Sequence, residues 1–323
     1  MKPHGSPVVI IANPEDAGQR LDVFLCGHLD TSRSKAQQLI RGGYVSSDGP
    51  KPLKQSLPVE SGDRFEVVIP PADKPDFLPE PIPLDILYED SHIIVVNKSP
   101  GMVVHPGRGN IRGTLAGALL AHAGNIAGVG EPLRPGIVHR LDKNTSGVLV
   151  AALDEHSHRR LSDMIKNREV TRRYIAYVWG RPDPPAGTIE VPIGRHPRYG
   201  TRKAVRPDGR PAVTHYETVG TYEFVTKLDI RLETGRTHQI RVHLAHIGHH
   251  VFGDPDYGGR EERLGGFRPE VRLKARRLLG ELGRQALHAH RLAFNHPVDG
   301  RPLVFTAPLP GDLARFEAEI TGG

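Results

Sequence analysis

The residues with the clearest potential for chemistry lie in the segment GIVHRLDKNTSGVLV, where Arg140 and Asp142 occupy a short polar loop before an apolar strand at Val148–Val150. A carboxylate held at such a point can act as a nucleophile or as a proton acceptor. An Asp or Asn beside Thr-Ser-Gly also commonly closes a turn by hydrogen bonding to its own backbone, and Asp142 and Asn144 fit that role. Taken alone, the loop favours a turn, so its chemical meaning depends on the rest of the chain.

Further motifs accompany this loop in order along the chain. The run LYEDSHIIVVNKSPGMVVHPG precedes it, and TRRYIAYVWG, LETGRTHQIRVHLAHIGHHVFGDPDYG and LHAHRLAFNHP follow it. With HRLDKNTSG as the signature loop, this series resembles the RluA-type pseudouridine synthases over essentially the whole catalytic length. The resemblance implies an enzyme that isomerises uridine to pseudouridine in structured RNA. Together with the N-terminal module described below, it indicates the branch that acts on large-subunit ribosomal RNA.

The implied reaction defines the catalytic groups. It breaks the N1–C1′ bond of uridine, turns the uracil and joins C5 to C1′. A carboxylate must either attack the base or sugar covalently or remove the C2′ proton towards a glycal-like intermediate, and the sequence leaves both routes open. By resemblance this carboxylate is Asp142, and Arg241 matches the position that pairs with it through a bidentate guanidinium. Tyr174 matches the active-site tyrosine, whose ring can stack on uracil with its phenol near C5.

Other residues of the same motifs are expected to bind the substrate. Arg140 is predicted to contact the RNA or to take the space left by the target nucleotide, because the base must leave its stack. Arg236 and His238 are predicted to shape the site or to contact RNA, as are Thr237 and Gln239. The alternative role for Arg241 is that of a phosphate-binding or surface arginine. Without the resemblance, Tyr174 is expected to be a core residue of its strand.

We expect neither a metal nor a cofactor. The chain has no P-loop, GxGxxG or CxxC motif. A run of histidines lacks the carboxylate or thiolate ligands of a transition-metal site until Asp254, so these side chains are expected to line RNA or to satisfy local hydrogen bonds. The acidic pairs Asp154-Glu155 and Asp254/Asp256 are too scattered for the Mg²⁺ of a metal-dependent nuclease. The histidines of this run are His238, His243, His246, His249 and His250.

The strands and helices predicted around these residues indicate an α+β domain on a mixed, largely antiparallel sheet. The resemblance implies the same architecture, the pseudouridine synthase fold. Short β-like runs alternate with a few helical segments and have the spacing of hairpins. Strands are predicted at 93–96, 148–152, 174–178, 214–219 and 224–232, and helices at 114–123, 156–167 and 238–247.

A small module precedes this domain. Leu21–Leu25 has helical spacing, and Thr31 or Ser32 can cap a second helix that runs to Ile40. An extended stretch begins at Val45, and residues 65–69 alternate as a second strand. RLDVFLCGHLDTSRSKAQQLIRGGYVSSDG and SGDRFEVVIP resemble the S4 domain, a small α/β RNA-binding module. Its second helix carries cations that face no acidic partner in the sequence, which favours RNA docking. These predicted RNA-binding cations are Arg33, Lys35 and Arg41.

Proline-rich sequence separates the two units, and the expected organisation is an S4-like domain at 19–70, a stiff linker at 71–83 and a catalytic domain at 84–323. The net charge of +6 suits a polyanionic partner. Six basic residues between 195 and 210 face the single acid Asp208 in a loop broken by Pro and Gly, which suits phosphates. A second basic stretch, 263–284, looks helical and carries interspersed acids, so it reads either as a solvated helix face or as a further RNA contact.

The chain lacks the long apolar run of a membrane-spanning helix and has one cysteine, Cys26, which fits a reducing compartment. We expect a cytoplasmic protein without membrane contact, and a monomer because no heptad pattern is visible. Ribosomal precursor particles are the expected partners, with tRNA as the alternative substrate. A non-catalytic RNA-binding assembly factor is the alternative from another class. The one departure noted in the catalytic motifs is Arg172, where the family often has lysine.

Overall fold

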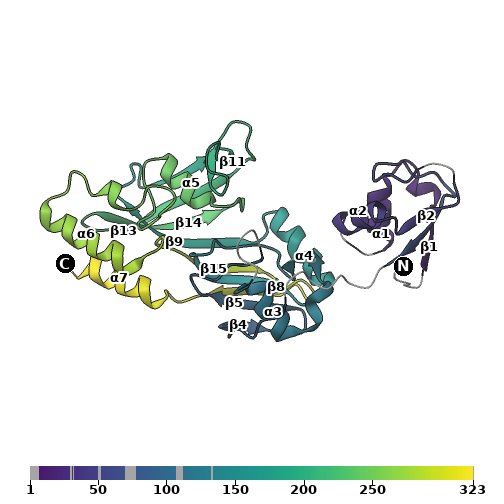
Figure 1. Cartoon of the computed structure of the whole chain (residues 1–323), viewed down its shortest axis with the longest axis horizontal. Coiled ribbons are helices and arrows are strands. Elements are labelled where there is room, and N and C mark those ends of the chain that lie inside the picture. The colour runs from purple at the N-terminus through teal and green to yellow at the C-terminus, as the bar shows by residue number, and fades with distance from the viewer. Residues whose placement is uncertain are drawn as a thin grey trace.

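The computed structural model describes a small N-terminal module and a larger C-terminal domain (Figure 1). The expected α+β class and the largely antiparallel sheet are confirmed. Separate hydrophobic cores account for the division, because each set of elements buries its own apolar side chains. The N-terminal module has one core, and the C-terminal domain has a large core and a small satellite cluster. The described residues are 7–29, 31, 33–49, 52–69, 78–106, 112–131 and 134–322.

The N-terminal module packs two helices against a three-stranded antiparallel sheet of order β1-β3-β2. Leu21, Phe24 and Leu25 form the buried face of the first helix and meet Phe65 of β3. Both expected helices and the two expected strands are confirmed; β1 was not expected. The suggested capping residue Ser32 lies outside the described residues. The elements are β1 Pro7–Ile11, η1 Pro14–Asp16, α1 Leu21–His28, α2 Arg33–Arg41, β2 Val45–Ser47 and β3 Arg64–Val68.

Asp22 corrects one expectation about the cations of α2. Its carboxylate is buried and accepts hydrogen bonds from Arg20 at 3.0 Å, from Arg33 at 3.0 Å and from Gln37 at 2.6 Å. The bond from Arg20, with those from Gln37 and Arg33, holds the pKa of Asp22 well below its usual range although burial opposes this. The prediction that Arg33 lacks an acidic partner is therefore wrong, because α1 and α2 fold Asp22 against it.

The C-terminal domain is built on a nine-stranded sheet in which all neighbours are antiparallel except β15 and β8. Its order is β10-β13-β14-β9-β15-β8-β5-β4, and β16 pairs with β15 off this path. All five expected strands are confirmed. The central strand β15 comes from LHAHRLAFNHP, which the sequence indicated as a motif and not as a strand. The strands are β4 Ile86–Glu89, β5 Ile93–Lys98, β8 Ser146–Ala152, β9 Thr171–Trp179, β10 Ala186–Glu190, β13 Val213–Thr221, β14 Val225–Leu232, β15 Leu287–Asn295 and β16 Pro302–Thr306.

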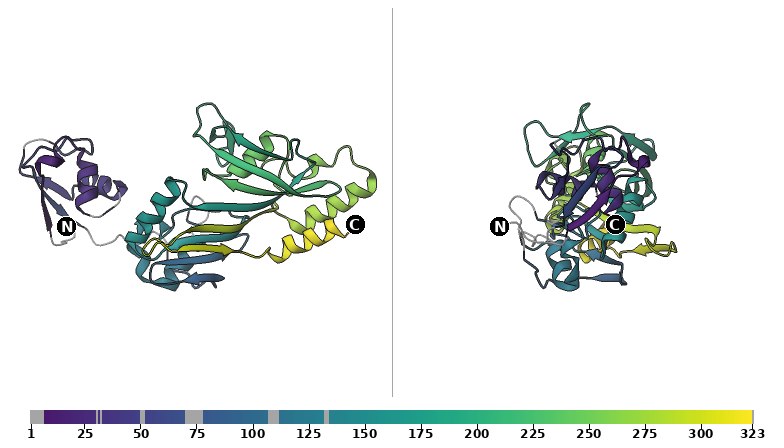
Figure 2. Two further views of the ribbon diagram at one scale, coloured as in Figure 1. Left: turned by 180° about the vertical axis from the view of Figure 1, so that it is seen from behind. Right: turned by 90° about the vertical axis from the view of Figure 1, so that its right-hand side faces the viewer.

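Helices pack on both halves of this sheet (Figures 1 and 2). α3 and α4 accompany β5 and β8, whereas α6 and α7 pack together near the C-terminus, and α5 contacts β12 and β13. Thr114 caps α3 by accepting from Gly117 N–H at 3.0 Å, and Asp154 caps α4 by accepting from Ser157 N–H at 2.8 Å. These helices are α3 Leu115–Ala123, α4 Glu155–Lys166, α5 Gln239–His246, α6 Pro269–Leu282 and α7 Gly311–Thr321, with 3-10 turns η2 Asn125–Gly128 and η3 Glu261–Arg263.

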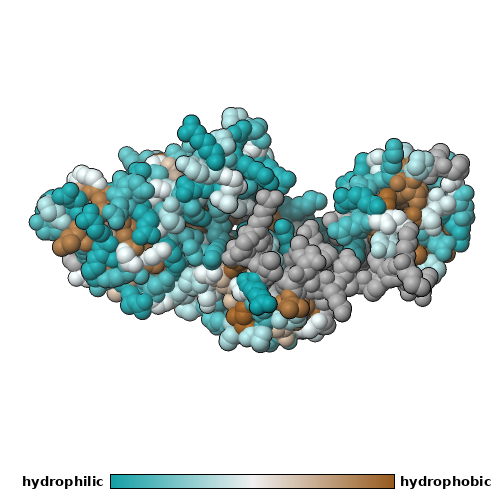
Figure 3. All heavy atoms as spheres, viewed as in Figure 1, coloured by the Kyte–Doolittle hydropathy of each residue, from teal (hydrophilic) through white to brown (hydrophobic). Residues whose placement is uncertain are grey.

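Two short hairpins complete the domain: β6 Gly130–Glu131 with β7 Arg134–Pro135, and β11 Ile193–Arg195 with β12 Lys203–Val205. The second hairpin carries much of the basic stretch 195–210. The basic stretch 263–284 contains α6, where Arg277 pairs with Glu281 at 3.0 Å and with Glu319 at 2.7 Å, so part of its charge is neutralised. The surface seen in Figure 3 is largely hydrophilic with small hydrophobic patches. Within the described residues, no helix is both long and apolar enough to cross a membrane.

Candidate active site

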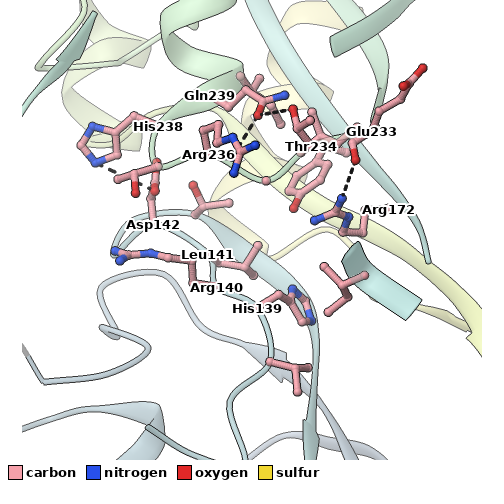
Figure 4. A pocket seen from close by; sticks show the side chains of 18 of the residues that line it. His139, Arg140, Leu141, Asp142, Arg172, Glu233, Thr234, Arg236, His238 and Gln239 are labelled. Atoms are coloured by element: carbon pink, nitrogen blue, oxygen red, sulfur yellow. Dashed lines mark hydrogen bonds and ion pairs between the residues drawn. The ribbon is translucent and has the colours of Figure 1, made fainter. Parts of the chain in front are cut away.

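Asp142 lies in the loop that leads into β8, and the turn expected of this segment is present. Its backbone carbonyl accepts from Thr145 N–H at 3.0 Å, which closes the expected turn. Its side chain, 14% exposed, lies 3.3 Å from Arg241 in the wall of a cavity of about 540 Å³. Figure 4 shows it beside His238. This volume is in the range of small-molecule and cofactor pockets. The turn therefore fixes the backbone and leaves the carboxylate available for chemistry.

Two buried cations donate hydrogen bonds to backbone carbonyls of the same loop. Lys98, 2% exposed, donates from Nζ to the carbonyls of Lys143 at 3.2 Å, Met102 at 2.9 Å and Ser99 at 2.8 Å. Arg284 donates to the carbonyl of Asn144 at 3.0 Å and forms a bidentate pair with Asp312 at 2.6 and 2.9 Å. Burial lowers the pKa of Lys98 to about 7, against the raising effect of Asp142. Lys98 lies in the motif LYEDSHIIVVNKSPGMVVHPG, and Arg284 lies shortly before LHAHRLAFNHP. The sequence alone does not indicate that both side chains bind backbone carbonyls of this loop.

Arg241, near the start of α5, joins three carboxylates. Its side chain is 4% exposed and forks onto Asp254 at 2.6 and 2.7 Å, onto Asp256 at 2.8 Å and onto Asp142 at 3.3 Å. Burial alone would lower the pKa of Arg241, but the hydrogen bonds to Asp254 and the nearby charge of Asp142 raise it above its ordinary value. Arg241 therefore contacts Asp142 as expected, but through a single bond from Nη1, and the bidentate fork expected on Asp142 lies on Asp254. Asp254 and Asp256, which the sequence suggested only as poor metal ligands, fix the guanidinium in place.

His238 approaches the other oxygen of Asp142, with Nε2 at 3.9 Å from Oδ1. Its Nδ1 lies 2.8 Å from the hydroxyl of Tyr257, which itself accepts from Lys203 N–H at 2.9 Å. If the Tyr257 hydroxyl donates to Nδ1, the remaining proton of the neutral ring lies on Nε2 and faces Asp142. Burial lowers the pKa of His238, although Asp142 opposes this. The φ of 59° at His238 is a strained conformation for a residue with a side chain, of the kind found at functional sites.

The remaining predicted residues of this domain also line the cavity. Tyr174 on β9 is 7% exposed, and burial raises the pKa of its phenol, while the charge of Arg172 opposes this. Arg140 is exposed at the mouth and lies 3.4 Å from His105 Nε2. Arg236 donates from Nε to the carbonyl of Pro211 at 3.1 Å. The predicted cations of the other domain, Arg33, Lys35 and Arg41, belong to α2 of the N-terminal module.

The structure shows one of the two roles expected for the histidines, that of satisfying local hydrogen bonds. Several make local contacts with backbone carbonyls, as His243 Nε2 does with Val191 at 3.1 Å and His249 Nδ1 with Trp179 at 3.1 Å. Over the described part of the chain, no group of three or more His, Cys, Asp and Glu side chains is arranged to hold a metal ion. The cavity thus combines a carboxylate held by an arginine, a buried phenol and several cations. These groups can bind a flat base and its phosphates and supply a nucleophile or a base.

Comparison with known proteins assigns this arrangement to a class. The family model described as RNA pseudouridylate synthase matches residues 92–246, and the S4 domain model matches residues 19–65. An uncharacterized RNA pseudouridine synthase of Chloroflexus aurantiacus is 48% identical over 94% of this chain and 91% of its own length. Ribosomal large subunit pseudouridine synthase D of Escherichia coli K12 is 43% identical over 93% and 90%. The solved human RNA pseudouridylate synthase domain containing 4 superposes with a TM-score of 0.56, at 25% identity over 73% of this chain and 92% of that one.

The fold and the two family-model matches are therefore those of an RNA-modifying isomerase with an appended S4 domain. The chain belongs to the RNA pseudouridine synthase family, as the resemblance of its motifs implied.

Proposed function

We propose that this enzyme isomerises specific uridines of large-subunit ribosomal RNA and that Asp142 is its essential carboxylate. The observation that carries the proposal is the carboxylate of Asp142 at 3.3 Å from Arg241 on the wall of a cavity large enough for a nucleotide. The choice of ribosomal RNA is supported by the name of the Escherichia coli relative and by the S4 domain match.

In the proposed mechanism the target uridine leaves its stack and enters the cavity, at a cost of about a few kcal/mol. Arg140, exposed at the mouth, contacts the RNA or fills the vacated space. The uracil lies against Tyr174, and Asp142 either forms a covalent bond to the substrate or removes the C2′ proton. Arg241 orients the carboxylate in both routes. The protons that leave C5 and reach N1 are the only atoms exchanged with the surroundings.

Tritium release from ribosomal RNA labelled as [5-³H]uridine tests this function, because C5 loses its hydrogen when it bonds to C1′. We expect release from large-subunit RNA in buffer that contains excess EDTA. Release from bulk tRNA alone would move the substrate assignment to tRNA. If neither RNA releases tritium, the protein acts as a non-catalytic RNA-binding factor and the proposed function is wrong.

The N-terminal module is predicted to supply RNA affinity and not chemistry. Deleting residues 1–75 removes Lys35 and Arg41 but leaves the separate hydrophobic core of the catalytic domain complete. We expect binding of large-subunit RNA to weaken by about tenfold or more and its salt dependence to flatten, because fewer phosphates are neutralised. Filter binding at two salt concentrations measures this. Tritium release from a short hairpin that carries the target uridine is the control, and its loss would contradict a pure docking role.

We also propose that the enzyme works as a monomer in the cytoplasm on ribosomal precursor particles. The single cysteine, Cys26, fits a reducing compartment, and structured RNA is the substrate that the S4 domain match favours.

A further inference from the structure

Arg172 is a second guanidinium of the active-site cavity, apart from the Asp142–Arg241 pair. It lies two residues before Tyr174 on β9, so both side chains project from the same face of the strand. Both residues line the cavity and are nearly buried, with 5% of Arg172 and 7% of Tyr174 exposed. Figure 4 shows Arg172 on the opposite side of the cavity from Asp142 and His238.

The charge of Arg172 is not neutralised by any described carboxylate. Its NH2 group donates to the backbone carbonyl of Glu233 at 3.3 Å, and its buried Nε has no hydrogen-bond partner among the described residues. The carboxylate of Glu233 is already engaged by Arg168 at 2.5 Å and by His215 at 2.7 Å. Arginine stays protonated in proteins, and an unpaired buried charge costs several kcal/mol. Such a group needs an explanation, and an anion that arrives with the substrate supplies one.

Gly235 makes room for this guanidinium. A Cβ atom added to Gly235 would lie 2.7 Å from NH1 of Arg172, closer than side chains tolerate. The residue lies in the cavity wall within the motif LETGRTHQIR. Its lack of a side chain therefore lets Arg172 keep its present position, and a larger residue would displace NH1.

The depth of Arg172 indicates which part of the RNA it meets. Three other cations that line the cavity, Arg140, Lys166 and Arg168, are exposed and suit the solvated phosphates of the strand. Arg241 is buried like Arg172, but carboxylates balance its charge. Arg172 is buried beside Tyr174, the residue expected to stack on uracil. A base turned into the cavity reaches this depth, whereas its phosphates stay nearer the mouth.

We propose that Arg172 is a catalytic residue that stabilises the negative charge on uracil when its bond to the ribose breaks. The inference rests on the proposed function. In either chemical route the electron pair of the N1–C1′ bond leaves with N1 and spreads over N1, O2 and O4. The guanidinium faces this charge while the base turns. The pair that then forms the C5–C1′ bond comes from the base, C5 loses its proton, and N1 gains one, so the anion is consumed.

Substrates with different leaving groups test this role. Fluorine at C5 withdraws electrons and stabilises the departing base, so 5-fluorouridine needs less help from the enzyme. We expect Arg172→Gln to slow single-turnover consumption of uridine by about 10²-fold or more, the scale of a lost oxyanion donor, and that of 5-fluorouridine by less than about 10-fold. Nuclease digestion and mass spectrometry of the target nucleoside measure both reactions. Arg172→Lys, which keeps a charge, should retain most of the rate.

Two variants separate this role from a structural one. Gly235→Ala keeps Arg172 but displaces its NH1, and we expect the same dependence on fluorine with a smaller loss. Lys166→Gln, the matched change of an exposed cation on the cavity wall, should weaken RNA binding and affect both nucleosides equally. Equal losses on uridine and 5-fluorouridine for Arg172→Gln, or a change in affinity alone, would overturn the proposal. Failure of the wild type on both nucleosides would instead overturn the proposed function.

Discussion

The Asp142→Asn protein is expected to bind ribosomal RNA and to release no tritium from it. The amide has nearly the shape of the carboxylate but is neither a nucleophile nor a base, so both routes to the intermediate are closed. The loss expected for removal of a group of this kind is about 10⁴-fold or more. Affinity should stay within a few-fold, because phosphate contacts elsewhere carry most of the binding. Folding should survive, since Arg241 keeps Asp254 and Asp256 as partners.

The measurement is single-turnover tritium release beside filter binding, with wild type and variant at the same salt concentration. Asp256→Asn is the matched control, because it also removes one carboxylate oxygen from Arg241 but from a residue outside the reaction, 38% exposed. We expect this control to lose less than about tenfold. If Asp142→Asn retains release within tenfold of wild type, Asp142 is not the essential carboxylate.

The sequence predicted the elements best where the pattern was local. The buried run IIVV of β5 and the apolar run of β8 follow from hydrophobic residues on consecutive positions. The strand β15 was missed because His288 and His290 interrupt its apolar positions. His288 is nevertheless buried, with Nδ1 at 3.0 Å from Ser146 Oγ, a partner that local sequence cannot reveal.

The active site could be predicted only from the family resemblance, because the residues that contact one another there lie far apart in the sequence. Asp142 and Arg241 are separated by 99 positions, and nothing in local spacing brings them together. Lys98 donates from Nζ to the carbonyl of Lys143, but nothing in the sequence distinguishes it from other lysines at strand ends. Sequence spacing does not reveal that Asp22, on the preceding helix, pairs with Arg33. Long-range pairing of charges is set by how helices and strands pack, which is the part of the structure that periodicity does not encode.

Arg241→Gln is expected to damage both catalysis and stability. Its guanidinium contacts the side chain of Asp254, which is 0% exposed, and two further carboxylates. Removing one partner of a buried ion pair costs about 3–5 kcal/mol, because the remaining charge is left uncompensated. We expect the free energy of unfolding, measured by urea denaturation, to fall by about this amount. Tritium release should fall by about 10³-fold or more, since Asp142 loses the group that orients it.

A second substitution separates the two effects. In Arg241→Gln/Asp254→Asn the uncompensated buried charge is gone, so a substantial part of the unfolding free energy should return, whereas tritium release should stay as low as in the single variant. Arg241→Lys keeps a positive charge but cannot form the fork onto Asp254, and we expect it to fall between wild type and Arg241→Gln in both measurements. Recovery of activity together with stability in the double variant would contradict the orienting role, because it would show that Arg241 acts only by balancing the charge of Asp254.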